Sequence, residues 1–327
     1  MSILVVGSVA LDSVKTPAGS RQDALGGSAT YFAVASSYFA PVSVVAAVGD
    51  DFRAEDRRVL EDHHVDMAGL AIFPGKTFRW VGEYGQDMNT AHTLDTQLNV
   101  FARFSPRLGP DQRKRPFLFL ANIDPELQQQ VLYQMEERPK LVVGDTMDFW
   151  IRGKPQALRQ VIANVDILMV NEAEARQLTG ETSLVRAARH LLRQGPRMVV
   201  VKRGEYGALG FTADATFATP AYPLETVVDP TGAGDSFAGG FLGYLAASGD
   251  LTLDGFHRAM VVGSVMASFT VESFGLERLR SLTPEDIQER YQEFWRLTYF
   301  GSPADAPLPV GSPRLPGRRP AGARRSP

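Results

Sequence analysis

The stretch Val228–Ala247, VDPTGAGDSFAGGFLGYLAA, decides the fold of this chain. Asp229-Pro230-Thr231 ends an extended approach, because the residue before a proline is kept out of the helical region. Gly232 to Gly234 then allow a tight turn that exposes backbone N–H groups. After Asp235 the apolar residues recur at helical spacing. The stretch therefore predicts a glycine turn that leads directly into a closely packed helix.

Such a turn is an anion-binding site, since the unpaired N–H groups and the positive end of the helix dipole point the same way. Asp235 places an acid inside this site. A carboxylate there repels a phosphate unless it takes a proton from the group to which the phosphate moves. The combination indicates phosphoryl transfer. The alternative is that Asp235 only complements the helix dipole.

The full run closely resembles the second signature of the ribokinase-like (PfkB) carbohydrate kinases, D-x-x-G-A-G-D-x-F. The resemblance implies that Asp235 is the catalytic base. It also implies that the amides of Gly232, Ala233 and Gly234 form the anion hole for the transferred phosphate. ATP as co-substrate and Mg²⁺ as cofactor follow from the same resemblance.

The composition fits a soluble globular protein, with 327 residues, 44% of them hydrophobic and 22% charged. The absence of cysteine excludes disulfides, thiolate metal sites and thiol nucleophiles. Five arginines and one aspartate give residues 301–327 a net charge of +4, which leaves −7 on the remainder. The acidic body argues against a nucleic acid partner. No apolar stretch is long enough to cross a membrane, and we expect a cytoplasmic protein.

The short apolar run Ile3–Val6 predicts a buried parallel strand, and Asp12 follows it. Open α/β sheets bind ligands beyond the carboxyl ends of their strands. The resemblance implies that Asp12 binds substrate hydroxyls, although it is alternatively a turn-forming aspartate. A dinucleotide-dependent dehydrogenase is disfavoured, because Gly7-Ser8-Val9-Ala10 stands where its G-x-G-x-x-G motif belongs.

The run Gly26-Gly27-Ser28 opens a second helix and resembles the first signature of the family, G-G-x-x-x-N. The resemblance implies that these three residues contact the substrate. The position of the family asparagine is held by Tyr31. An aromatic ring therefore replaces an amide, so the identity of the substrate cannot be inferred from that of ribokinase.

Two extended segments, Thr77–Tyr84 and Thr93–Phe101, interrupt the alternation of strands and helices. Together with Val14–Asp23 they predict a small β lid, at about residues 14–24 and 76–101, of the kind that covers the sugar in the resembled family. The resemblance also allows a homodimer that forms through this lid. The candidates for substrate contact in the lid are Trp80, Tyr84, Asn89 and Gln97.

Asn171 and Glu174 follow the buried run Ile167–Val170 and open a helix. Their spacing places them on one helix face. The pair resembles the N-x-x-E motif of the family, which organises the water shell of Mg²⁺. Mg²⁺ keeps several waters and takes few direct protein ligands, which agrees with such a role. The alternative is an N-cap asparagine followed by a surface glutamate.

The run Lys202 to Gly207 resembles the hairpin that borders ATP in the family. The resemblance implies that Lys202, Gly204 and Gly207 border the nucleotide, with Thr231 on the same side. Either Lys202 or Arg203 is the candidate for contact with a phosphate, and the alternative is that both are solvated turn charges. The resemblance also allows a monovalent cation site in the region of Asp229 and Thr231.

Taken together, the patterns predict a ribokinase-like α/β kinase domain over residues 1–300. We expect a mostly parallel central sheet flanked by helices, with the small β lid. Residues 301–327 hold seven of the 21 prolines and few apolar residues, which predicts a disordered basic tail.

The predicted function is ATP-dependent phosphorylation of a hydroxyl on a sugar or sugar-like small molecule. A nucleoside kinase of the same fold is an alternative, because Tyr31 and Trp80 offer rings that can stack on a base. A non-catalytic sugar- or nucleotide-binding regulator is disfavoured, since Asp235, Asn171 and Glu174 occur together.

Overall fold

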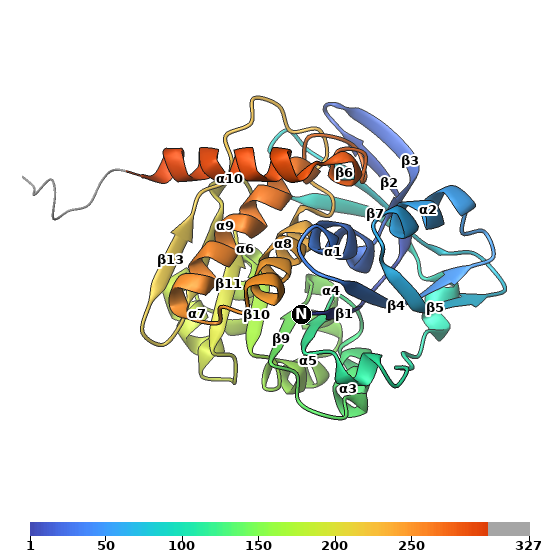
Figure 1. Cartoon of the computed structure of the whole chain (residues 1–327), viewed down its shortest axis with the longest axis horizontal. Coiled ribbons are helices and arrows are strands. Elements are labelled where there is room, and N and C mark those ends of the chain that lie inside the picture. Colours follow the sequence, from blue (N-terminus) through green and yellow to red (C-terminus); the bar gives the residue numbers. More distant parts are fainter. Residues whose placement is uncertain (300–327) are drawn as a thin grey trace, which may run out of the picture.

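A nine-stranded sheet forms the centre of the computed structural model, which describes residues 1–299 (Figure 1). Its strand order is β13-β12-β11-β10-β9-β8-β1-β4-β5, and only the β11–β12 and β12–β13 pairs are antiparallel. The predicted tail lies outside the described residues. The strands are β1 (Ile3–Val6), β4 (Val42–Gly49), β5 (Asp66–Phe73), β8 (Phe117–Leu120), β9 (Leu141–Asp145), β10 (Ile167–Asn171), β11 (Met198–Lys202), β12 (Ala208–Phe211) and β13 (Thr216–Thr219).

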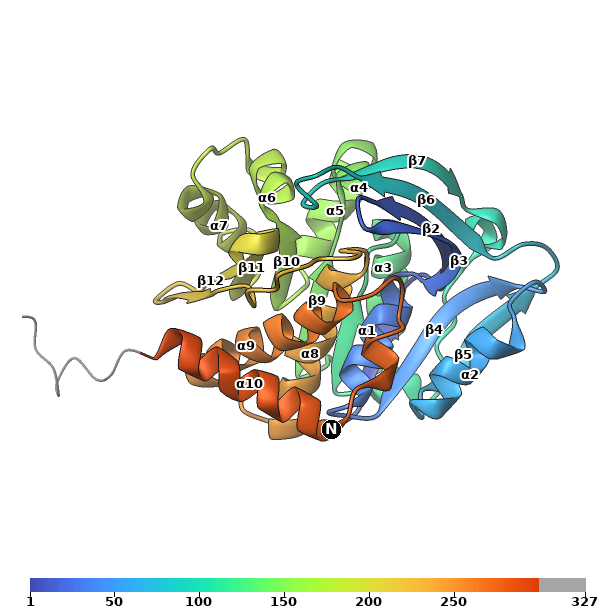
Figure 2. The same ribbon diagram turned by 90° about the horizontal axis from the view of Figure 1, so that it is seen from above.

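Helices cover both faces of this sheet (Figure 2). One layer contains α1 (Ser28–Ser37), α2 (Ala54–Asp62), α8 (Ala233–Ser248), α9 (Leu253–Thr270) and α10 (Pro284–Thr298). The other contains α3 (Pro125–Gln134), α4 (Asp148–Gly153), α5 (Pro155–Ile162), α6 (Glu172–Thr179) and α7 (Leu184–Leu192). Short 3₁₀ turns span Asn99–Arg103, Gln112–Lys114, Gly204–Tyr206 and Leu279–Ser281.

The strands are apolar without interruption because both of their faces are buried. In β1, Ile3 and Val5 point into the core beneath α1 and α8, while Leu4 and Val6 point into the core beneath α3 to α7. Parallel sheets covered by helices on both sides require this pattern. The arrangement is the mostly parallel sheet that the apolar runs predict.

A second sheet of four strands, here named the lid sheet, has the order β3-β2-β6-β7. Its strands are β2 (Ala10–Thr16), β3 (Gly19–Gly26), β6 (Phe78–Tyr84) and β7 (Ala91–Gln97). The predicted extended segment to Phe101 was too long, since Asn99–Arg103 forms a 3₁₀ turn. Phe101 is buried there between the rings of Phe78 and Phe104, so packing overrides the extended conformation.

Helix α8 lies at the centre of its layer, against both α1 and α9. Its glycines permit this close approach. A Cβ atom on Gly239 would lie 2.6 Å from the carbonyl oxygen of Phe32, and one on Gly240 would lie 2.8 Å from that of Val262. These neighbours are backbone atoms, which cannot move away without displacing a helix. The small residues after Asp235 therefore fix the position of the helix that begins at the anion-binding turn.

Gly239→Ala should lower the free energy of unfolding by about 1–3 kcal/mol, the usual cost of overpacking a dense core. Gly153→Ala is the matched control, because Gly153 ends α4 and a Cβ atom added there would meet no neighbour within 4 Å. Its unfolding free energy should change by less than about 0.5 kcal/mol. Urea unfolding of both variants is the measurement, and equal effects would contradict the packing argument.

Candidate active site

The turn that the sequence places at the start of α8 is present. Gly232 is the N-cap residue with φ of 78°, a left-handed conformation that favours glycine. The ring of Tyr31 lies directly against it, so there is no room for a side chain at this position. Ala233 begins the helix, and Asp235 lies in its first turn.

Asp235 lies in a charged and largely buried environment. Burial and, to a smaller extent, the charge of Asp145 raise the pKa of its carboxyl from 3.8 to about 7, while the charge of Lys202 opposes both effects. A carboxyl group with this pKa gains and loses its proton near neutral pH. Such a pKa suits a general base that works near neutral pH.

Lys202 and Asp145 form an ion pair at the ends of β11 and β9. The distance from Lys202 Nζ to Asp145 Oδ2 is 2.8 Å, and both side chains are mostly buried. Lys202 Nζ also lies 3.1 Å from the position that a Cβ on Gly234 would take, so the ammonium group is next to the glycine turn. Asp145 was not among the residues predicted from the sequence. An acid directly after a buried strand, the same signal as at Asp12, was available to find it.

Asn171 and Glu174 meet through a capping box at the start of α6. Asn171 Oδ1 accepts from the Glu174 N–H at 2.8 Å, and Glu174 Oε2 accepts from the Asn171 N–H at 2.7 Å. Asn171 is the N-cap and therefore precedes the helix, and the spacing of three residues brings it together with Glu174 as predicted.

Glu174 is also not a surface residue, since only 8% of it is exposed. Burial, followed by the nearby Asp145, raises the pKa of its carboxyl to about 7. The charge of Lys202 opposes this rise. Lys202 is therefore surrounded by Asp145, Glu174 and Asp235, which together raise its own pKa against the effect of burial.

Asp12 is in a strand of the lid sheet and is not the turn residue of the alternative interpretation. It belongs to β2, pairs with Trp80 of β6, and is 5% exposed. Its carboxylate lies over Gly26, where a side chain would collide with it, and accepts from the Gly27 N–H at 3.3 Å. Burial, with smaller contributions from the charges of Asp229 and Asp235, raises the pKa of Asp12 to about 7, although the hydrogen bond from Gly27 opposes the rise. Gly26 and Gly27 therefore make room for this carboxylate.

The side chains of two further residues of the first signature contact other parts of the protein. The Ser28 hydroxyl is hydrogen-bonded to Ser8, at 3.1 Å between the two oxygens, and is buried. Tyr31 is 1% exposed, with its ring against Gly232. The expectation that this ring can stack on a base was wrong, because its face is already covered by the turn.

The lid sheet contacts the signature stretch at two points. The Thr231 hydroxyl donates to the Tyr84 hydroxyl at 3.2 Å, and the Thr16 hydroxyl donates to the Val228 carbonyl at 2.8 Å. Trp80 is partly exposed and donates from its indole N–H to Thr93 at 3.1 Å. Gln97 is exposed and donates to Asp95, away from these contacts.

Gly204 and Gly207 bound a 3₁₀ turn between β11 and β12. Both have positive φ values, 54° and 81°. Gly207 lies against the carbonyl of Thr219, so its lack of a side chain serves the hairpin itself. Gly204 faces the lid turn that contains Asn89.

Asp229 is 1% exposed and holds the start of the signature stretch to a later loop. It accepts from the Thr231 N–H at 2.9 Å and from the Gly275 N–H at 3.3 Å. The carbonyl of Val271 accepts from the Val228 N–H at 2.8 Å. The sequence could not assign this loop, and the structure brings it to Asp229.

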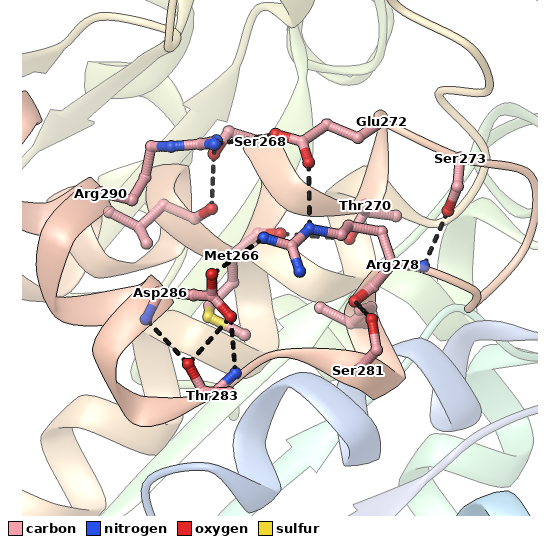
Figure 3. Close-up of polar contacts among 12 residues, drawn as sticks. Met266, Ser268, Thr270, Glu272, Ser273, Arg278, Ser281, Thr283, Asp286 and Arg290 are labelled. Atoms are coloured by element: carbon pink, nitrogen blue, oxygen red, sulfur yellow. Dashed lines mark hydrogen bonds and ion pairs between the residues drawn. The ribbon is translucent and has the colours of Figure 1, made fainter.

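Two arginines keep the loop in place (Figure 3). Arg278 binds Glu272 and Asp286, each at 3.2 Å, and Arg290 binds Glu272 at 2.9 Å. The guanidinium of Arg290 also lies between the rings of Tyr222 and Phe269. Helix α10 thus supports the loop that reaches the active-site turn.

Among the residues that the structure describes, no three histidine, cysteine, aspartate or glutamate side chains gather as metal ligands. Within residues 1–299, none of the helices is long and apolar enough to span a membrane.

The fold and the site define an α/β phosphotransferase, with an acid at an anion-binding helix start and a lid sheet above it. Residues 2–280 match the family described as pfkB family carbohydrate kinase. The chain belongs to this family. Membership confirms the predicted ATP-dependent kinase with a hydroxyl group as acceptor, on a sugar or a nucleoside.

A cytidine kinase of Thermococcus kodakarensis is 32% identical over 248 residues, which cover 74% of this chain and 87% of that protein. Among solved structures, a nucleoside kinase of Methanocaldococcus jannaschii has a TM-score of 0.72 at 22% identity, covering 89% of this chain and 98% of that one. Aminoimidazole riboside kinase of Salmonella enterica, with its riboside and an ATP analogue, has a TM-score of 0.70 at 20% identity, covering 89% and 100%. These structures confirm the ribokinase-like fold class.

Asp235→Asn should stabilise the protein at pH 8. The unfolded chain loses the Asp235 proton above its ordinary pKa of 3.8, whereas the folded chain keeps it up to about pH 7. The wild-type protein therefore loses stability as the pH rises between these values, and an amide does not. Urea unfolding near pH 4 and at pH 8 is the measurement.

The exposed Asp214→Asn is the control, and its effect should be the same at both pH values. An Asp235→Asn protein that gains no stability at pH 8 relative to pH 4 would contradict the raised pKa.

Proposed function

We propose that this kinase transfers the γ-phosphoryl group of ATP to a hydroxyl of a sugar-like small molecule, with Asp235 as the general base. The observation that carries the proposal is the position of Asp235, half-buried in the first turn of α8 directly after the Gly232 turn. Its pKa of about 7 matches a base that works near neutral pH. Proton removal by such a positioned base typically contributes about 10²–10⁴-fold in rate.

The amides of Gly232, Ala233 and Gly234 act as the anion hole, and Lys202 adds a positive charge beside Gly234. Negative charge spreads over the transferred group in the transition state, and fixed donors stabilise it without reorganisation. Asp145 is a positioning residue, since its ion pair holds Lys202 at the turn. Gly204 and Gly207 shape the turn that borders the nucleotide beyond Lys202. Thr231, which donates to Tyr84 of the lid sheet, lies between the nucleotide side and the acceptor side.

Asp12 binds hydroxyls of the acceptor on the side of the lid sheet. A carboxylate accepts from two adjacent hydroxyls at once. Gly26, Gly27 and Ser28 form the floor of this subsite through their backbone, since the Ser28 side chain is bonded to Ser8. Burial raises the pKa of the Tyr31 and Tyr84 hydroxyls, and the charges of both Asp12 and Asp235 contribute to the rise. The two carboxyl groups therefore lie near the same tyrosines, as expected where the acceptor hydroxyl lies between them.

The residues at the start of α6 fit Mg²⁺. Glu174 offers an oxygen ligand close to Asp145 and Lys202, and Mg²⁺ prefers few carboxylates with several waters. Bound there with ATP, Mg²⁺ would neutralise phosphate charge. Asn171 would hold Glu174 in orientation through the capping box.

Asp229 is the candidate ligand for a monovalent cation. It is buried, accepts only two backbone N–H bonds, and forms no ion pair within residues 1–299. A buried carboxylate without a positive partner is costly, and a cation beside it would offset that cost.

A nucleoside is the second candidate acceptor. Trp80 pairs with Asp12 across β2 and β6, so the two side chains share one face of the lid sheet. Gly82, two residues on, leaves space that the indole occupies. A partly exposed aromatic ring beside a hydroxyl-binding carboxylate suits a base joined to a sugar. The similarity to a cytidine kinase supports the same choice. A cytoplasmic location and a homodimer through the lid stay predictions.

The decisive experiment is ATP consumption by the full chain with separate sugars and nucleosides, followed by identification of the phosphorylated product. Turnover with free sugars alone would favour the first candidate, and turnover with cytidine or another nucleoside would favour the second. Failure of every acceptor, with ATP bound, would contradict the proposal.

Glu174→Gln should raise the Mg²⁺ concentration needed for half-maximal rate by roughly tenfold or more, the usual loss when a supporting group of a metal site is changed. A glutamine oxygen still accepts from the Asn171 N–H, so the helix cap survives. Glu172→Gln is the control, because Glu172 binds Arg176 and Arg203 instead. Equal shifts in both variants would contradict a magnesium role for Glu174.

A further inference from the structure

The turn that joins β6 to β7, residues 85–90, docks on the turn Gly204–Tyr206 at the end of β11. Asn89 Nδ2 donates to Glu205 Oε1 at 3.0 Å, and Asn89 Oδ1 accepts from the Glu205 N–H at 3.3 Å. The two residues are 116 positions apart in the chain. In Figure 2 this end of the β6–β7 hairpin extends toward α6 and β11, on the opposite side of the molecule from α2.

The contact is specific for an amide and a glycine. Asn89 uses its donor and its acceptor at the same time, which neither a carboxylate nor an alanine can do. Gly204 has φ of 54°, and a side chain on it would collide with Asn89 Oδ1. Turn 85–90 and turn Gly204–Tyr206 are therefore complementary in shape and in hydrogen bonding.

The two ends of the contact belong to different halves of the active site. On the lid side, β6 pairs with β2 beside Asp12, and its last residue, Tyr84, is hydrogen-bonded to Thr231. On the other side, the Gly204–Tyr206 turn begins two residues after Lys202, which lies against Gly234. A movement that lifts the lid sheet from the acceptor subsite must also separate Asn89 from Glu205.

We propose that Asn89 is a positioning residue that couples the two substrates, because it ties closure of the lid sheet to the Gly204–Tyr206 turn. The inference rests on the proposed function, which assigns this turn to the nucleotide. Nucleotide that orders the turn favours the closed lid, and the closed lid in return orders the turn. The bonds are solvent-exposed, so water replaces them at little net cost in free energy when the two turns separate.

Hydrogen exchange of the full chain, with and without Mg²⁺ and a non-hydrolysable ATP analogue, tests the proposal. The analogue should slow exchange of amides in residues 78–97 of the wild-type protein about three- to tenfold, the effect of one net hydrogen bond. Asn89→Asp should abolish the slowing, because it removes the donor and sets a carboxylate against that of Glu205. Adding Glu205→Gln to this variant supplies a donor again and should restore it.

Gln86→Ala is the control, from the same exposed turn, and should behave as the wild type. Equal slowing in the wild type and in Asn89→Asp would overturn the coupling role of Asn89. The same holds if the wild type binds the analogue, by calorimetry, without any slowing in residues 78–97. Absence of analogue binding in the wild type would instead overturn the proposed nucleotide site, and this inference with it.

Discussion

The contact between the ring of Tyr31 and the left-handed turn at Gly232 is the constraint on which the site depends. It fixes α1 against the start of α8, so the exposed amides and Asp235 have one orientation. The glycines further along α8 hold the same helix against α1 and α9. Close packing of backbone on backbone thus sets the direction of the anion-binding turn, and the chemistry follows from that direction.

The site contains more carboxyl groups than Lys202 alone can neutralise. Asp145, Glu174 and Asp235 surround Lys202, and Asp12 lies across the turn. Burial raises the pKa of Asp12, Glu174 and Asp235 to about 7, and this cost to stability is typical of a functional site. A phosphorylated substrate with its cation would change this balance, because both alter the charge around the same carboxyl groups. Active sites commonly retain such strain because it serves the reaction.

The local features of the fold and the site could be predicted from the sequence. The glycine turn, the helix after it and the apolar strands follow from short-range patterns, and the family follows from the Gly-Ala-Gly-Asp run. Asp12 was assigned to the acceptor side, but its location in a lid strand depends on pairing with Trp80. The Asp145–Lys202 ion pair joins residues 57 positions apart, and no local pattern encodes it. The burial of Tyr31 likewise depends on α8, far along the chain, so its ring was wrongly expected to face the substrate.

The central claim is that Asp235 removes the proton from the acceptor hydroxyl. The most direct test compares single-turnover phosphorylation by the wild type and by Asp235→Asn, with an acceptor from the substrate panel and ATP at saturating concentration. The account predicts a loss of phosphoryl transfer of at least about 100-fold, with the affinity for a non-hydrolysable ATP analogue nearly unchanged. A rate within tenfold of the wild type, which is about 1.4 kcal/mol of barrier, would contradict it.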